Sequence, residues 1–210
     1  MLARYEPPGS SRTKGEVMRY ILACVAISSI TLSTAALAKE DVPLSIEAIV
    51  AGIEVKNDPL DQFIKVSTFN VVRERYAESL AKNPSEALFM RAFIDKKTRE
   101  ATYQVYRMTS SSRGWDFFKT ASFEDKDGPS VVPVKRTGSD ASCFRSGCRT
   151  YEDVIFEVPV TTLEWVVSDP AKTEWRYKIS AESGKVIEEP ITVREISAIL
   201  QTVKRVQAER

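Results

Sequence analysis

Four β-rich runs in the middle of the chain are joined by connections of about five residues. The runs span 87–95, 102–108, 115–123 and 131–135, and they contain many aromatic and β-branched residues, which favour strands. The connections, such as 110–114, are rich in turn residues. A parallel strand pair needs a crossover of a dozen or more residues, so successive strands are expected to be antiparallel. The middle of the chain therefore predicts an antiparallel meander.

The end of the chain has the pattern of an amphipathic helix. Pro190 precedes it, and Thr192 followed by Glu195 forms a capping box, which satisfies free backbone N–H groups at a helix start. Six aliphatic residues then recur at helical spacing: Val193, Ile196, Ile199, Leu200, Val203 and Val206. We expect an α+β fold, a mainly antiparallel sheet with this C-terminal helix packed on it. The alternative is a helix that docks on a membrane or a partner with its stripe exposed.

The remaining segments give weaker patterns, and no internal repeat or domain-scale linker separates them. The expected elements are 39–62 (strand or short helix), 63–72 (strand), 73–82 (short helix or loop), 153–159 (strand), 161–168 (helix or strand) and a hairpin of 175–180 with 186–188. We expect a single mature α+β domain over 39–210.

An uncharged run, residues 21–38, lies near the start of the chain. It ends in an Ala-Leu-Ala sequence that closes at Ala38, and small residues there suit signal peptidase. We expect 18–38 to be a signal peptide and 1–17 to be an upstream extension or an n-region. Cleavage near Ala38 would leave a periplasmic or secreted protein. Because about 18 residues can just cross a bilayer, an inner-membrane anchor is the alternative, although Ser and Thr weaken it.

The chain contains no histidine, and its mature part is close to neutral. Without histidine there is no Ser-His-Asp or Cys-His nucleophile and no histidine-ligated metal, and we expect no cofactor. Removing residues 1–38 takes away four of the 30 basic and two of the 29 acidic side chains, which leaves 26 against 27. A chain without a basic excess lacks the electrostatic footprint of nucleic-acid binding, so nucleic acid is not an expected partner.

Two cysteines remain after cleavage, Cys143 and Cys148. An even pair in an exported chain predicts a disulfide. Zinc would need two more ligands in a chain without histidine, and a thioredoxin-type pair would be spaced C-x-x-C. The ring is short, so the bond is expected to shape one turn more than to stabilise the whole fold.

Basic residues flank the cysteine pair and form a candidate surface for an anionic partner. They are Lys135, Arg136, Arg145 and Arg149. Asp140 is the only acidic residue within 135–150, so this segment has a local charge of +3. Such a loop suits an anionic glycan, a lipid headgroup or an acidic protein face. The alternative is a solvated loop with arginines along the edge of the sheet.

Other motifs are weak. Ser79 and Lys82 match S-x-x-K, but the companion motifs of the serine–lysine enzymes are absent, so a solvated helix face is the better interpretation. Residues 124–128 resemble half a calcium loop without its later ligands, and we interpret them as a hairpin turn. Six aromatic residues are expected in the core, or alternatively in a ligand cleft: Trp115, Phe117, Phe118, Trp165, Trp175 and Tyr177.

Together these features predict an exported protein of the periplasm or cell envelope. We expect a binding or envelope-maintenance protein more than an enzyme, with an envelope protein or a glycan as its partner. Two alternatives stay open: a carboxylate-based enzyme acting on a glycan or anionic substrate, and a membrane-anchored accessory subunit that keeps residues 18–38. A deep polar cleft with converging carboxylates would favour the enzyme.

Overall fold

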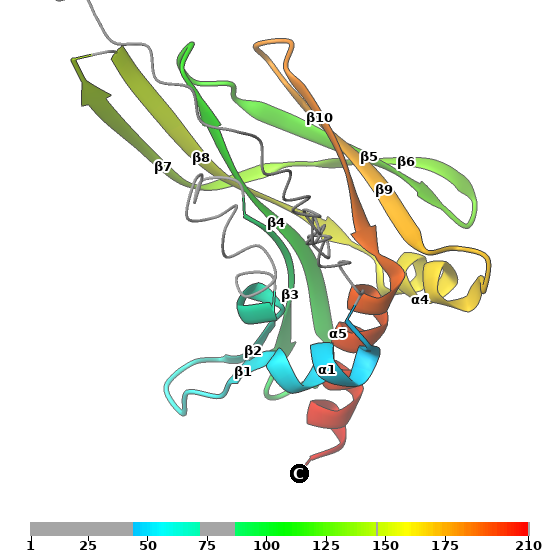
Figure 1. Ribbon diagram of the computed structural model, residues 1–210. Helices are drawn as coiled ribbons and strands as arrows, with labels where there is room; N and C mark the ends of the chain where they lie inside the picture. Colours follow the sequence, from blue (N-terminus) through cyan, green and yellow to red (C-terminus); the bar gives the residue numbers. More distant parts are fainter. Residues whose placement is uncertain (1–43, 72–86, 146, 210) are drawn as a thin grey trace, which may run out of the picture. The chain divides into compact units, whose positions relative to one another are not determined.

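Antiparallel strands in two sheets dominate the computed structural model, which describes residues 44–71, 87–145 and 147–209 (Figure 1). The six-stranded sheet has the order β1 (Glu54–Lys56), β2 (Phe63–Ser67), β3 (Leu88–Asp95), β4 (Ala101–Ser111), β8 (Gly147–Val158) and β7 (Lys135–Phe144). The four-stranded sheet has the order β10 (Val186–Thr192), β9 (Glu174–Ala181), β5 (Phe118–Asp125) and β6 (Gly128–Pro133). The predicted α+β class with mainly antiparallel sheet is confirmed.

The chain passes from one sheet to the other after β4. The expected pairing of successive strands holds for β3 with β4 and for β5 with β6. β4, however, pairs with β8, and β5 pairs with β9 in the other sheet. Backbone φ angles of 102° at Gly114 and 56° at Phe117 turn the chain out of the first sheet. The sequence shows that a turn lies here, but it does not show which sheet receives the next strand.

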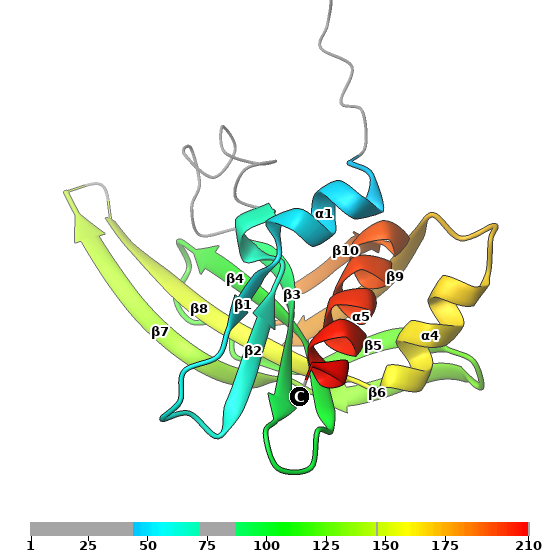
Figure 2. The same cartoon turned by 90° about the horizontal axis from the view of Figure 1, so that it is seen from below.

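The described residues also form helices α1 (Ile46–Gly52), α4 (Val160–Ser168) and α5 (Val193–Ala208). α5 begins at the predicted cap, where the Thr192 hydroxyl accepts a hydrogen bond from the Glu195 amide at 3.2 Å. Five of the six residues of its aliphatic stripe are buried in the main core, and Val193 is half-buried against it. Figure 2 shows α5 along the six-stranded sheet with α1 beside it. The predicted packing of this helix on the sheet is confirmed. The segment expected over 73–82 lies outside the described residues.

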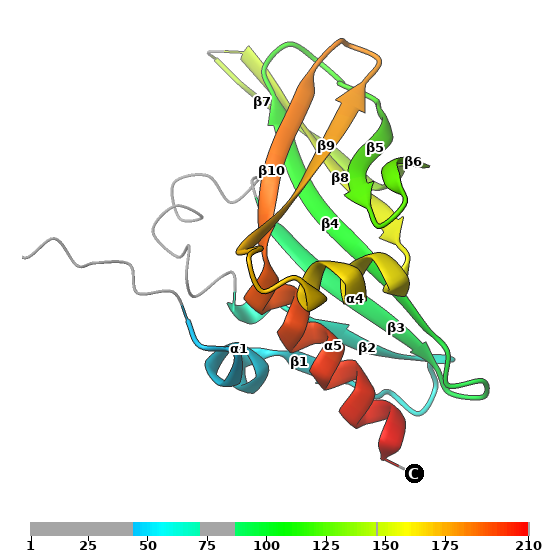
Figure 3. The same cartoon turned by 90° about the vertical axis from the view of Figure 1, so that its right-hand side faces the viewer.

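Alternate residues of β2 and β3 face opposite sides of the six-stranded sheet. Ile64, Val66, Met90, Ala92 and Ile94 are buried in the same core as α5. We call that side, which Figure 3 shows with α5 against it, the inner face. The residues between them point to the opposite side, the outer face.

The predicted core aromatics divide into three groups. Phe118, Trp175 and Tyr177 are buried. Trp115 and Trp165 are half-buried, and Phe117 is exposed. The positive φ angle of Phe117 turns its side chain away from the core, so the core prediction is wrong for this residue.

β7 and β8 form a long hairpin at the edge of the six-stranded sheet (Figure 1). Cys143 and Cys148 lie opposite each other beside the turn, with their sulfur atoms 2.07 Å apart, as expected for the predicted disulfide. No helix within the described ranges is long and apolar enough to cross a membrane. The predicted signal peptide, 18–38, lies outside those ranges.

Candidate functional site

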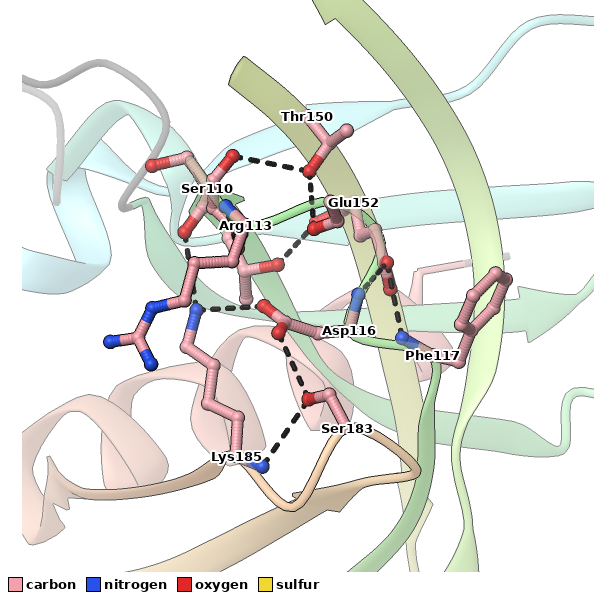
Figure 4. Close-up of polar contacts among 11 residues, drawn as sticks. Ser110, Arg113, Asp116, Phe117, Thr150, Glu152, Ser183 and Lys185 are labelled. Carbon is pink, nitrogen blue, oxygen red and sulfur yellow. Dashed lines mark hydrogen bonds and ion pairs between the residues drawn. The ribbon is translucent and has the colours of Figure 1, made fainter. Parts of the chain in front are cut away.

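Buried polar side chains cluster at the connection between β4 and β5 (Figure 4). Glu152 of β8 is 3% exposed, and its Oε1 atom accepts hydrogen bonds from the backbone N–H groups of Asp116 (2.8 Å) and Phe117 (3.1 Å). The Thr150 hydroxyl donates to the carbonyl of Gly114 at 2.8 Å. These bonds satisfy backbone groups of a connection that lies outside the strands, and so hold it in its turned conformation.

Asp116 also binds the turn between β9 and β10. Its Oδ2 atom lies 2.8 Å from Lys185 Nζ, and its Oδ1 atom accepts a hydrogen bond from Ser183 Oγ at 3.0 Å. Lys185 Nζ also donates to the carbonyl of Ser110 in β4 at 3.1 Å. One carboxylate and one ammonium group therefore join segments of both sheets (Figure 4).

A second ion pair links the inner face of the six-stranded sheet to β10 of the four-stranded sheet. Arg107 of β4 is 6% exposed and donates from Nη2 to Glu189 Oε1 at 2.8 Å, while the Tyr177 hydroxyl donates to Glu189 Oε2 at 3.1 Å. Burial, and then the charge of Glu189, raises the pKa of Tyr177 well above its ordinary value. Two nitrogens of Arg107, Nε and Nη1, have no hydrogen-bond partner among the described residues. Desolvation offsets much of the attraction in such a pair, so it adds little net stability.

These carboxylates do not converge on an open cleft. Glu152, Asp116 and Glu189 each bind an amide, a lysine or an arginine of the protein itself. None of them lines either of the two pockets considered below. Over 44–71, 87–145 and 147–209, no group of three or more His, Cys, Asp or Glu is placed to hold a metal ion. We assign these carboxylates to holding the sheets together.

Two of the four predicted surface cations lie at the start of β7 and already contact other side chains of the protein. Lys135 pairs with Glu157, with Nζ and Oε1 3.3 Å apart. The guanidinium carbon of Arg136 lies 5.2 Å from the centroid of the Phe117 ring and 5.8 Å from that of Trp115. Arg136 therefore covers the exposed Phe117 ring by a cation–π contact.

Arg145 and Arg149 lie at the other end of the hairpin, near its turn. Arg145 is about 30 Å along the strand from Arg136, at ~3.3 Å per residue. Arg136 pairs with Val154, which is buried on the inner face. Arg149 is an odd number of residues from Val154 on the same strand, so its side chain points to the outer face. The four cations therefore do not form one surface, because strand register and alternation divide them.

A groove on the outer face of β1, β2 and β3 gathers aromatic and basic side chains. Its volume is about 360 Å³. The guanidinium carbon of Arg91 lies 5.1 Å from the centroid of the Phe93 ring and 4.9 Å from that of Tyr106, and Nε donates to Gln104 Oε1 at 3.0 Å. We call this site the outer groove; its lining includes Lys56, Lys65, Phe69, Phe89, Arg91 and Phe93.

The outer groove carries more positive than negative charge. Lys56, Lys65 and Arg91 line it, against one carboxylate of the described lining, Glu54. The Nζ atom of Lys65 also lies 3.6 Å from Oδ2 of Asp61, but both side chains are about half exposed, so this ion pair is weak. Among the described residues, no carboxylate pairs with Arg91.

Arg91 and its neighbouring rings are partly desolvated. Burial lowers the pKa of the Arg91 guanidinium, while Tyr106 acts in the opposite direction, and the group stays a cation at neutral pH. Burial also raises the pKa of Tyr106 to about 12, with a hydrogen bond to Asp153 acting in the same direction. The Tyr106 ring stacks on Phe89, with centroids 4.5 Å apart. The groove therefore offers a fixed cation beside neutral aromatic faces, which can stack on a ligand ring and bind an anionic group.

The alternation of Phe89, Arg91 and Phe93 is the one signal of this groove in the sequence. Residues at every second position of a strand share a face, so these three side chains are expected to lie together. Lys56 and Lys65 come from β1 and β2, which reach the same face only through strand pairing. That pairing is a long-range property, and the predicted elements do not specify it.

A second pocket of about 360 Å³ lies between the end of β8 and β6. Much of its lining is apolar, including Tyr103, Val132 and Val160. Its charged residues, Lys135 and Glu157, pair with each other. Because this pocket has no net charge to offer, it is a weaker candidate for an anionic ligand than the outer groove.

Known proteins do not assign a function to either pocket. No family model, curated protein or solved structure matches the chain.

Proposed function

We propose that the protein is an exported, non-enzymatic binding protein of the cell envelope, and that its outer groove binds an anionic glycan. The observation that carries this proposal is the position of Arg91. Its guanidinium carbon lies 5.1 Å from the centroid of the Phe93 ring and 4.9 Å from that of the Tyr106 ring, and no carboxylate among the described residues pairs with it. A partly buried cation without a counter-charge favours an anionic ligand group beside it.

The aromatic rings beside this cation favour a sugar acid over a simple anion. The apolar face of a sugar ring can pack on Phe93 while its carboxylate binds the Arg91 guanidinium through paired hydrogen bonds. Nε of Arg91 already donates to Gln104, so the ligand would meet the two terminal nitrogens. Lys56 and Lys65 extend the positive lining along the groove, which suits a chain of charged sugars.

The chemistry of the groove supports binding more than catalysis. Arginine stays protonated and does not act as a general acid or base at neutral pH. Glu54 is the one carboxylate in the described lining, whereas glycosidases generally use two. Export is supported by the Cys143–Cys148 pair, because disulfides persist in oxidising compartments, and by the signal peptide predicted over 18–38.

Isothermal titration calorimetry with an oligogalacturonate tests the proposal. We expect the full chain to bind this acidic oligosaccharide and not a neutral malto-oligosaccharide of equal length. Arg91→Gln is expected to weaken binding by about 10- to 100-fold, because a hydrogen bond to a charged group contributes about 1.5–3 kcal/mol. Arg91→Lys keeps the charge but loses the paired bonds, so it should restore only part of the affinity.

Lys178→Gln is the matched control. Lys178 is exposed on β9, in the four-stranded sheet, so its removal changes net charge without touching the outer groove. This variant is expected to bind like the parent. Equal affinity of Arg91→Gln and the parent, or equal binding of acidic and neutral sugars, would contradict the proposal.

A further inference from the structure

The β7–β8 hairpin continues past its neighbouring strand, β4 (Figure 2). Pairing between β4 and β8 ends at Ser111 and Thr150, whereas β7 and β8 stay paired as far as Phe144 and Gly147. Residues 142–145 and 147–149 therefore have no third strand beside them within the described part of the chain. We call this two-stranded end the hairpin tip.

The Cys143–Cys148 disulfide holds the shape of the hairpin tip. The two residues are directly opposite each other in the strand register. Because the loop that the bond closes is short, it constrains the unfolded chain little and adds little to overall stability. Its main effect is local: it holds the ends of β7 and β8 together beside the turn, which lowers the entropy cost of any contact that the tip makes.

The hairpin tip exposes an aromatic side chain between two cations. Phe144 is 72% exposed. Arg145 follows it in the turn, and Arg149 follows the second cysteine; both are exposed, and neither forms an ion pair with a described residue. A single exposed aromatic is common on protein surfaces. Here it stands at the apex of a constrained tip, with unpaired positive charge on both sides.

We propose that the hairpin tip docks on an anionic membrane surface, with Phe144 at the interface and the two arginines on lipid phosphates. Phenylalanine is among the apolar side chains that interfacial segments bury at the boundary of headgroups and acyl chains, and arginine binds phosphate through paired hydrogen bonds. Each basic residue close to an anionic bilayer strengthens binding by about fivefold. This contact is separate from the outer groove and requires no membrane-spanning segment.

The size of the hairpin tip favours a membrane over a protein partner. A stable protein interface buries about 800 Å² on each partner and uses about 20–30 residues of each. Residues 142–149 are too few to supply such an area. A bilayer requires only that the apex reach the interface while the cations reach the headgroups.

Cosedimentation of the full chain with lipid vesicles tests this docking. The vesicles contain either equal parts of phosphatidylcholine and phosphatidylglycerol or phosphatidylcholine alone. We expect the double variant Arg145→Gln, Arg149→Gln to partition about 20-fold more weakly onto the anionic vesicles, and Phe144→Ser several-fold more weakly. The N-terminal segment is the same in every variant, so the differences report on the hairpin tip.

Two controls remove similar side chains elsewhere. Val131→Ser replaces an aliphatic residue of β6 that is 66% exposed. The double variant Lys126→Gln, Lys178→Gln removes two exposed charges away from the tip. Both should partition like the parent, and thermal melts should show that all variants are folded.

Phe144→Trp gives a direct readout of insertion. Its fluorescence, relative to the parent, is expected to be quenched by brominated lipids in the anionic vesicles. Unchanged partitioning of both tip variants, or no added quenching, would overturn the proposal and favour an acidic protein partner. Sugar binding by the outer groove is measured without lipid, so failure of one proposal is distinguishable from failure of the other.

Discussion

Single charged residues connect parts of the chain that are far apart in sequence. Asp116 accepts bonds from Lys185 and Ser183, and Glu152 accepts a bond from the Asp116 amide. Removing one member leaves its partner with an unmet hydrogen bond in a partly buried site. Such a change costs more than the small net stability that the pair adds.

We expect Asp116→Asn to lower the free energy of unfolding by about 1–3 kcal/mol. Asparagine keeps the shape of the side chain but removes the charge that lies 2.8 Å from Lys185 Nζ. Because the Lys185 side chain is 34% exposed and its ammonium group can be hydrated instead, the loss of unfolding free energy should lie near the lower end of this range. Urea denaturation measures it. Asp127→Asn, in an exposed pair with Lys126, is the control and should change the free energy of unfolding by less than about 0.5 kcal/mol. Equal losses in the two variants would contradict the role of Asp116 in joining the sheets.

Two tyrosines, the buried Tyr103 and the half-buried Tyr106, are expected to make the protein less stable at alkaline pH. Burial raises the pKa of Tyr103 and of Tyr106 to about 12, whereas an unfolded tyrosine has a pKa of about 10. Between these values the unfolded state loses phenolic protons that the folded state keeps, so the free energy of unfolding falls as pH rises from about 10 to about 12. Below pH 10 the contribution is fully present.

Urea denaturation at stepped pH measures this dependence. Tyr106→Phe removes one of the tyrosines with a raised pKa and should reduce the slope relative to the parent. Lysines titrate in the same range, so the comparison with this variant isolates the tyrosine contribution. A slope that is the same in both proteins would show that Tyr106 is not protected as the structure indicates.

At the scale of elements, the role of α5 is to stabilise the fold through its residues in the main core. Leu200 is 5% exposed in the main core, so Leu200→Ala should lower the free energy of unfolding by about 2–5 kcal/mol. Lys204→Ala should change it by less than about 0.5 kcal/mol, because its pair with Glu164 at 3.3 Å is exposed. Thermal melts compare the two variants. A Leu200→Ala protein that melts with the parent would support the docking-helix alternative.

Elements with strong local signals could be predicted from the sequence. The cap at Thr192 and the stripe through Ile199 and Leu200 depend on residues within a few turns of one another, and the structure reproduces them. Cys143 and Cys148 are likewise close in the chain and meet as expected. Local chemistry is sufficient where the partners are neighbours in sequence.

At the scale of the whole molecule, local signals are not sufficient. Arg136 and Arg149 are close in sequence, yet strand alternation puts them on opposite faces. Lys56 and Arg91 are far apart in sequence, yet the pairing of β1, β2 and β3 brings them to one groove. The candidate site therefore depends on register and sheet order, and only the alternation around Arg91 is visible in the sequence.

Processing of the whole chain is a further prediction. Signal cleavage after Ala38 should give a mature protein that begins at Lys39, because small residues before that position suit signal peptidase. N-terminal sequencing and intact mass of the native protein check this. Retention of residues 18–38 in a membrane fraction would instead support the anchored subunit.

Amide chemical-shift mapping by NMR locates a bound sugar on the protein without any substitution. On addition of oligogalacturonate, we predict saturable shifts in β1, β2 and β3 around Lys56, Lys65 and Arg91. The amide shifts of Asp116 and Lys185, whose side chains join the two sheets, should stay unchanged. Shifts confined to other surfaces, or no shifts at high sugar concentration, would contradict the assignment of the outer groove as an anionic-glycan site.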